Sequence, residues 1–291
     1  MMSTPSEQSQ NESSYIIDAE SAAEMARLVS QDQLTTKSMG GVLPEQTDLS
    51  GIHRVLDIAC GPGGWVLDVA FEHPDIQVVG IDISQTMVEY ARVRSKVQKL
   101  ENASFQVMNA LKPLDFPDAS FDLVNARTIA GFMLPASWPV LLQECMRITR
   151  PGGIIRLTET DDFGTSNSPA LEKMTRMALR AGQLAGRTFN PEGRNAAVTP
   201  MLGRFLRKAG CKNIKKRAHV IDYSSGEEAH DGVYRDLMVA LQLLQPFLTK
   251  IGFISQEELE QLYQQVLTEL VSNDFCALWY LLTVWGQKPA A

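Results

Sequence analysis

The chain has 291 residues, of which 44% are hydrophobic and 21% are charged. These fractions are typical of a globular protein and exclude a wholly disordered, collagen-like or coiled-coil chain. With 27 basic and 34 acidic residues the formal net charge is −7, which argues against general binding to nucleic-acid backbones or anionic membranes. We therefore expect a small molecule as the partner, and no nucleic acid.

The N-terminal residues, the uncharged runs and the cysteines indicate the cellular location of the protein. Residues 1–14 are rich in Ser, Gln, Asn and Glu, so we expect a disordered tail and no secretory signal. The longest uncharged runs, 128–143 and 275–287, are shorter than the roughly 20 apolar residues of a membrane span, so no membrane insertion is expected. The four cysteines have no metal-binding spacing. A cytoplasmic protein with free thiols and no metal is expected.

Strands and helices alternate between residues 53 and 160. Short apolar runs predict strands at 55–59, 78–81, 104–108, 121–126 and 153–158. Amphipathic patterns predict helices at 65–72, after the N-cap Ser84, and at 137–149. Near-continuous apolar strands that are joined by helices predict a parallel sheet with both faces covered. The predicted fold class is therefore α/β, with a doubly wound sheet.

The remaining segments divide into two kinds. A helix at 200–209 and strands at 213–223 and 275–286 would complete the sheet, so we assign 199–223 and 275–288 to the core together with 51–160. Three segments stand outside the alternation: 15–50, which is mostly helical, 161–198, and 224–274, which carries two helical patterns.

The most informative segment is the run VLDIACGPGG at 55–64. Asp57 lies inside a predicted strand and is followed four and six residues later by Gly61 and Gly63. Two glycines let the backbone approach a ligand closely. A dinucleotide fingerprint needs a third glycine where this chain has Val66, which disfavours a nicotinamide oxidoreductase. Asp82 ends the next predicted strand, where a carboxylate can accept hydrogen bonds from both ribose hydroxyls.

Residues 52–160 resemble the class I S-adenosylmethionine-dependent methyltransferases, in particular those that act on small molecules. The resemblance rests on the glycine motif and on four further motifs: VGIDIS at 79–84, Asn109-Ala110, FDLV at 121–124 and RPGG at 150–153. It implies a Rossmann-like, seven-stranded, mostly parallel sheet whose antiparallel last strand lies between the fifth and the sixth. It also implies S-adenosylmethionine as the cofactor, S-adenosylhomocysteine as the product, and no metal.

The resemblance also implies which residues hold the donor. They are Tyr15, Asp57, Gly61, Gly63, Asp82, Ile83, Met87, Asn109, Ala110, Leu111 and Arg127. Within this set the two glycines would lie beside the methionine part, Asp57 would order their loop and Asp82 would hold the ribose. Asn109 stands where the family often has Asp, and with the next two residues it would hold the adenine. Tyr15 opens a helix that folds over the donor in related enzymes.

The carboxyl ends of the parallel strands form the ligand edge of such a sheet. We therefore expect 15–50 to form a helical lid, and 161–198 with 224–274 to form a helical cap over an apolar acceptor site. Methyl transfer from a sulfonium is an in-line displacement, and an oxygen acceptor benefits from a general base. The candidates are Glu159 and Asp161, which follow the fifth strand, and His230 in the cap; each could instead cap a helix or face solvent.

The leading interpretation is a cytoplasmic methyltransferase of secondary metabolism that acts on a small, largely apolar metabolite, at oxygen rather than nitrogen or carbon. One alternative is a C-methyltransferase of the ubiquinone or menaquinone type. Another is a non-catalytic S-adenosylmethionine-binding protein with a regulatory or assembly role. A homodimer is compatible with the sequence.

Overall fold

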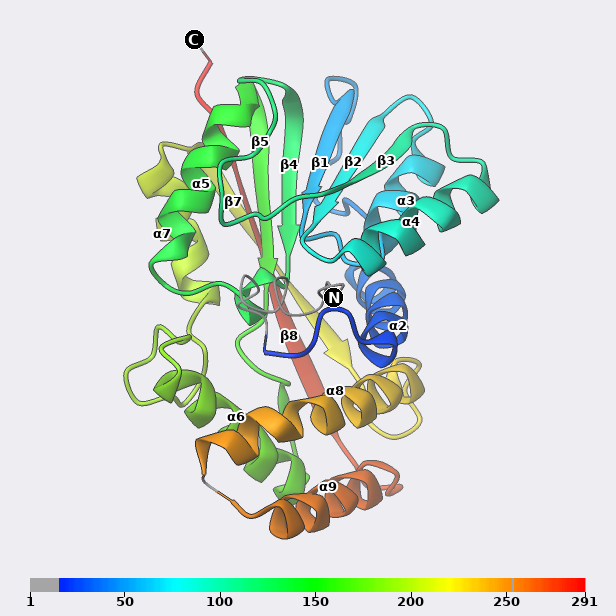
Figure 1. Ribbon diagram of the computed structural model, residues 1–291, viewed down its shortest axis with the longest axis vertical. Helices are drawn as coiled ribbons and strands as arrows, with labels where there is room; N and C mark the ends of the chain where they lie inside the picture. Colours follow the sequence, from blue (N-terminus) through cyan, green and yellow to red (C-terminus); the bar gives the residue numbers. More distant parts are fainter. Residues whose placement is uncertain (1–15, 253, 291) are drawn as a thin grey trace, which may run out of the picture.

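The computed structural model describes residues 16–252 and 254–290, so the predicted tail at 1–14 and Tyr15 lie outside the described residues. Its centre is one twisted sheet with the order β3-β2-β1-β4-β5-β8, and β7 lies on the free side of β8 (Figure 1). The strands are β1 (Arg54–Ile58), β2 (Gln77–Asp82), β3 (Ala103–Val107), β4 (Phe121–Arg127), β5 (Thr149–Glu159), β6 (Thr165–Ser166), β7 (Lys212–Asp222) and β8 (Ala277–Gln287).

The pairing pattern confirms the doubly wound α/β fold. Strands β1 to β5 pair in parallel, and β8 runs antiparallel between β5 and β7, as the resemblance implies. The sheet differs from the expectation by one short strand, β6, which makes it eight-stranded. β8 extends beyond the end of β5, and β6 pairs with Leu278 and Ala277 there. The extra strand therefore supplies hydrogen-bond partners to a stretch of β8 that β5 does not reach.

The helices of the protein cover both faces of this sheet or lie beyond the carboxyl ends of its parallel strands. They are α2 (Ala22–Met39), α3 (Gly64–Glu72), α4 (Gln85–Gln98), the 3₁₀ turn η1 (Ile129–Gly131), α5 (Ser137–Ile148), α6 (Pro169–Leu184), α7 (Thr199–Ala209), α8 (His230–Ile251) and α9 (Gln256–Leu270). Neighbouring side chains of β1 point to opposite faces: Val55 packs in the core that includes α3 and α4, and Leu56 in the core that includes α5 and α7. Ser84 caps α4, as predicted, by accepting a hydrogen bond from the Met87 N–H at 3.1 Å.

A third apolar cluster lies beyond the carboxyl ends of the parallel strands. It joins α6, α8 and α9 to the lower parts of β7 and β8 (Figure 1). Leu241 of α8 and Val266 of α9 are fully buried in it, and Trp279 of β8 is 6% exposed. These three helices thus form a layer that faces the ligand edge of the sheet. None of the helices within the described residues combines the length and the apolar character of a membrane span.

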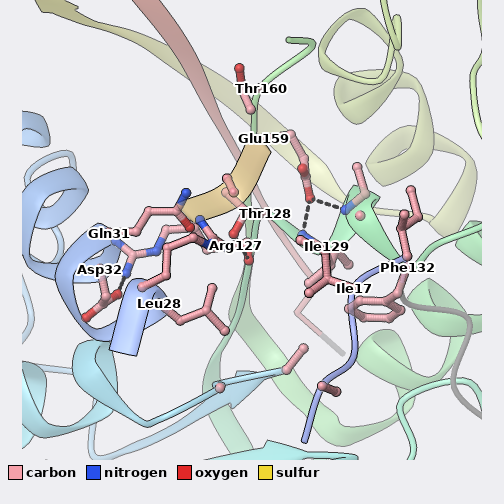
Figure 2. A pocket seen from close by; sticks show the side chains of 18 of the residues that line it. Ile17, Leu28, Gln31, Asp32, Arg127, Thr128, Ile129, Phe132, Glu159 and Thr160 are labelled. Atoms are coloured by element: carbon pink, nitrogen blue, oxygen red, sulfur yellow. Dashed lines mark hydrogen bonds and ion pairs between the residues drawn. The ribbon is translucent and has the colours of Figure 1, made fainter. Parts of the chain in front are cut away.

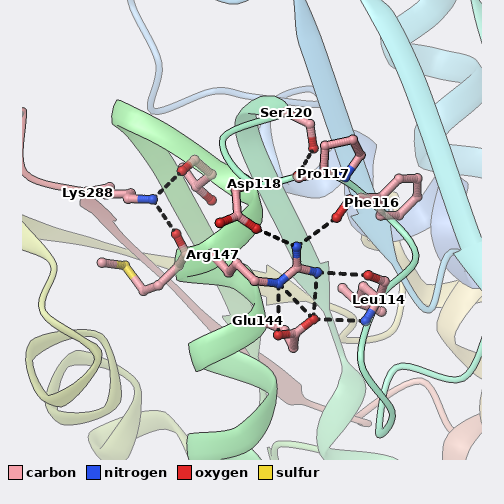
Figure 3. Close-up of polar contacts among 10 residues, drawn as sticks. Leu114, Phe116, Pro117, Asp118, Ser120, Glu144, Arg147 and Lys288 are labelled. Carbon is pink, nitrogen blue, oxygen red and sulfur yellow. Dashed lines mark hydrogen bonds and ion pairs between the residues drawn. The ribbon is translucent and has the colours of Figure 1, made fainter.

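Arg147 of α5 anchors the loop between β3 and β4 (Figure 3). Its guanidinium donates to the carbonyls of Leu114 at 2.8 Å and Phe116 at 2.7 Å, and it pairs with Glu144 at 2.8 Å. Beside it, the Lys288 ammonium donates to two carbonyls at the end of α5. One side chain therefore satisfies several backbone groups of a loop that has no strand or helix of its own.

We expect Arg147→Met to lower the free energy of unfolding by about 2 kcal/mol, because the loop carbonyls and Glu144 lose charged donors. Urea denaturation of the variant and the wild type measures this difference. The matched control is Asp118→Asn: Asp118 also pairs with Arg147, but its side chain is 78% exposed, so a change below about 0.5 kcal/mol is expected. Equal losses in the two variants would contradict the anchoring role.

Candidate functional site

A cavity of about 440 Å³ opens at the carboxyl ends of β1, β2, β4 and β5. The sheet edge forms one wall, α2 forms a second, and residues of α6 and α8 close the side away from the sheet. Figure 2 shows part of this lining, with side chains from α2, β4 and β5 directed into the same space. The volume lies within the range that suits a drug-sized ligand.

The glycine loop that follows β1 bends tightly against the sheet. Gly61 and Gly63 have φ values of +52° and +78°, which favour glycine. A Cβ at Gly63 would lie 2.6 Å from the Phe105 ring and 2.8 Å from the Ala91 side chain. Gly61 lines the cavity and Gly63 does not. Gly63 thus sets the path of the loop from behind, and its place beside the donor stays a prediction.

Asp82 joins the glycine loop to the end of β2. Its Oδ2 accepts a hydrogen bond from the Gly61 N–H at 2.8 Å, and its Oδ1 accepts one from the Ser84 N–H at 2.9 Å. Burial is the main cause that raises the pKa of this carboxyl, and the backbone donors oppose the rise. Each oxygen keeps a lone pair that a ligand hydroxyl can use. The carboxylate is therefore held in one orientation at the cavity wall.

Asp57 lines the cavity from near the carboxyl end of β1, and it ends a chain of buried polar side chains. Its carboxylate accepts a hydrogen bond from the Asn125 side chain at 2.7 Å, and the Arg156 guanidinium donates to that same amide at 2.8 Å. Arg156 forms a buried ion pair with Glu45. Burial raises the pKa of Asp57 to about 7, although Asn125 and Arg156 act in the opposite direction.

A third group of expected donor residues lies where β2 and β3 end. Ile83, Met87, Asn109, Ala110 and Leu111 all line the cavity. The Asn109 side chain accepts a hydrogen bond from the Leu111 N–H at 2.8 Å, which closes the turn after β3. The structure therefore brings these five residues to one wall, and their contact with a donor stays a prediction.

Arg127 ends β4 and points toward α2 (Figure 2). It forms an ion pair with Asp32, and its Nη1 donates to the Thr36 hydroxyl at 2.9 Å. Burial lowers the pKa of Arg127 to about 9. The α2 residues Leu28, Gln31 and Asp32 line the cavity as well, although no sequence motif had indicated them.

The helix α2 is tied to α8 by buried charges. Arg27 donates to Glu24 at 2.7 Å within α2 and to Asp236 of α8 at 2.8 Å. Gln31 donates to the second oxygen of Asp236 at 3.1 Å. Arg27 and Asp236 are 8% and 7% exposed and both line the cavity. Two segments that are about 200 residues apart in sequence therefore meet over the ligand edge.

Glu159 is the best-placed of the three candidate bases. It ends β5, is buried and lines the cavity. Its Oε1 accepts hydrogen bonds from the Ile129 N–H at 2.8 Å and the Ala130 N–H at 3.2 Å (Figure 2). Burial raises its pKa to about 8, and the two backbone donors oppose that rise. A carboxyl with such a pKa exchanges its proton near neutral pH.

The other two candidates have structural partners. Asp161 lines the cavity, but its two oxygens accept hydrogen bonds from the Val198 and Thr199 N–H groups and the Thr199 hydroxyl, so it holds the start of α7. His230 is not among the residues that line the cavity. Its Nδ1 lies 2.9 Å from the Tyr223 carbonyl oxygen, at the end of α8 that faces the strand ends. The structure therefore does not bring His230 to the cavity, and its role as a base stays a prediction.

The cavity also has large apolar side chains in its lining, which come from segments outside the glycine loop. They are Phe132, Phe163, Leu179, Leu237, Leu244 and Trp279. Within residues 16–252 and 254–290, no three His, Cys, Asp or Glu side chains are grouped so that they could hold a metal ion.

Comparisons with known proteins show what this chain resembles. Residues 55–153 match a family described as a methyltransferase domain. Demethylmenaquinone methyltransferase of Deinococcus radiodurans is 35% identical over 165 residues, which cover 54% of this chain and 67% of that protein. The 27-O-demethylrifamycin SV methyltransferase of Amycolatopsis mediterranei is 36% identical over 148 residues, half of each chain.

The solved structure of the YcgJ protein from Bacillus subtilis has the same fold, with a TM-score of 0.52 at 19% identity, over 82% of this chain and 93% of that one. The chain spans about half the length of several of the curated relatives it matches. The match with the Deinococcus protein covers 67% of that relative's length, and the match with methyltransferase pytC of Aspergillus terreus, at 26% identity, covers 71% of its length.

Proposed function

Because the chain belongs to the class I S-adenosylmethionine-dependent methyltransferases, we propose that it methylates a small, largely apolar metabolite at oxygen. The observation that carries the proposal is one cavity whose lining contains the glycine loop, Asp82 and several large apolar side chains, with the buried carboxyl of Glu159 in its wall. Two relatives that act on a menaquinone precursor and on a rifamycin precursor by name support a small, ring-bearing acceptor and a place in secondary metabolism.

The residues present fit the donor of this family. Gly61 and Gly64 bring the backbone of the glycine loop to the cavity, and the oriented carboxylate of Asp82 has lone pairs for two hydroxyls. Asp82 would hold the ribose, Gly61 would lie under the methionine part, and Asn109 to Leu111 would hold the adenine. When bound, the donor supplies an electrophilic methyl group on a sulfonium.

The chain's own part in the reaction is to align the acceptor, to exclude water and to accept a proton. The helices α2, α6 and α8 enclose the cavity and would keep water from the transferring methyl group. We assign 161–198 and 224–274 to a cap over the acceptor and α2 to a lid over the donor. Glu159 would take the proton of the acceptor hydroxyl while the oxygen attacks. The products would be a methyl ether and S-adenosylhomocysteine.

Methylation at carbon is the second candidate. It is favoured by the resemblance to demethylmenaquinone methyltransferases, and the same apolar cavity would suit a ring. A protein that binds the donor without turnover is the third candidate, because binding of the donor does not require that an acceptor is methylated.

The test is an acceptor screen with donor labelled in the methyl group. We expect label to appear in an alkali-stable methyl ether when a panel of phenols and hydroquinones is offered, with one S-adenosylhomocysteine formed per labelled product. Label in a ring carbon would replace the proposal by the C-methyltransferase reading. Tight donor binding without label in any product would replace it by the non-catalytic reading.

A further inference from the structure

The carboxylate of Asp32 holds an oxygen atom that lacks a partner. Oδ1 pairs with the Arg127 guanidinium, whereas Oδ2 is buried and accepts no hydrogen bond. Among the buried side-chain nitrogen and oxygen atoms of the described residues, it is the one without a partner. A buried carboxylate oxygen without a donor destabilises a folded protein, and such an atom calls for a functional reason.

This oxygen lies against the glycine loop. A Cβ on Gly64 would overlap the Asp32 carboxylate, and a Cβ on Gly61 would lie 3.8 Å from the Leu28 side chain one turn earlier on α2. Asp32 and Arg127 both line the cavity, and their side chains are 15% and 10% exposed. The glycines thus admit the carboxylate to the place where the methionine part of a donor would lie.

We propose that Asp32 and Arg127 together recognise the amino-acid end of the donor, an inference that rests on the proposed function. Asp32 Oδ2 accepts a hydrogen bond from the α-ammonium group, and Arg127 donates to the α-carboxylate. The guanidinium has five N–H donors, of which Thr36 and Asp32 take two. A fixed anion and a fixed cation side by side match a zwitterion in charge.

Calorimetry with two ligands tests the assignment. S-adenosylhomocysteine carries the amino-acid end, and 5′-methylthioadenosine lacks it. We expect Asp32→Asn, which keeps the shape of the side chain, to weaken S-adenosylhomocysteine binding about 10- to 100-fold and to change 5′-methylthioadenosine binding less than about twofold. The matched control is Glu228→Gln. It removes the carboxylate of an exposed ion pair with Lys37 of α2 and should change neither affinity.

A second variant separates the two charges. Arg127→Met should weaken S-adenosylhomocysteine binding but leave decarboxylated S-adenosylmethionine, which keeps its amino group, little affected. The same decarboxylated ligand should bind to Asp32→Asn about tenfold more weakly than to the wild type.

Four outcomes would overturn the inference. Equal weakening of both adenosine ligands by Asp32→Asn would mean that Asp32 merely positions α2. Unchanged S-adenosylhomocysteine binding would mean that the ammonium lies elsewhere. Binding of 5′-methylthioadenosine as tightly as S-adenosylhomocysteine by the wild type would remove the amino-acid subsite and leave the proposed function intact. Binding of no adenosine ligand would overturn the proposed function and the inference together.

Discussion

Replacing Asp82 by Ala is expected to reduce the affinity for S-adenosylhomocysteine at least 100-fold. The carboxylate would lose its hydrogen bonds to two ribose hydroxyls, and bonds to a charged acceptor contribute about 1.5–3 kcal/mol each. The change also leaves the N–H groups of Gly61 and Ser84 without their present acceptor, which loosens the glycine loop. Calorimetry should find binding in the micromolar range for the wild type, about −8 kcal/mol, and none for the variant.

Asp82→Asn is the matched comparison for this experiment. Asn keeps the volume and one acceptor oxygen, so its loss should be near tenfold and should lie between those of the wild type and Asp82→Ala. NAD, offered in parallel, should not bind, because the loop has Val66 where a dinucleotide fingerprint has its third glycine. Wild-type affinity for NAD, or full donor affinity in Asp82→Ala, would show that the ribose site is misplaced.

Local signals explain why the fold could be predicted. Apolar runs such as 55–59 and the turn residues after them fix strand, glycine turn and helix without reference to the rest of the chain. The position of β8 between β5 and β7 came from the family resemblance, because pairing between distant strands leaves no local trace. β6 could not be predicted, because a two-residue strand depends on where β8 happens to extend past β5.

The site residues likewise divide into those that local sequence signals indicate and those that tertiary contacts place. Asp57, Gly61 and Asp82 lie in predicted strands or directly after them, and the structure places all three at one cavity. Asp32 escaped notice because α2 reaches the glycine loop through its packing against α8, which includes the ion pair of Arg27 with Asp236. His230 does not line the cavity, because a position in the cap segment does not say which part of the helix faces it. Helix orientation is set by tertiary contacts, which a single sequence does not reveal.

Glu159→Gln is expected to lower kcat by two to four orders of magnitude with an oxygen acceptor, because proton transfer to a positioned base typically contributes that much. Gln keeps an oxygen that can accept from the Ile129 and Ala130 N–H groups, so the backbone there should stay in place. S-adenosylhomocysteine affinity, measured on the same sample, should change less than about threefold. A parallel loss of donor affinity would mean that the variant disturbs the fold of the site.

The pH profile separates a base from a buried structural carboxyl. Burial raises the pKa of Glu159 to about 8, so the active, ionised form is the minor one at pH 7. In the wild type kcat should rise about tenfold per pH unit below pH 8 and level off above it, whereas in Glu159→Gln this slope should disappear. Asp161→Asn is the comparison: both oxygens of Asp161 hold the start of α7, so its loss should lower stability and leave the slope unchanged. A slope that survives in Glu159→Gln would assign the proton to another group and remove Glu159 from the mechanism.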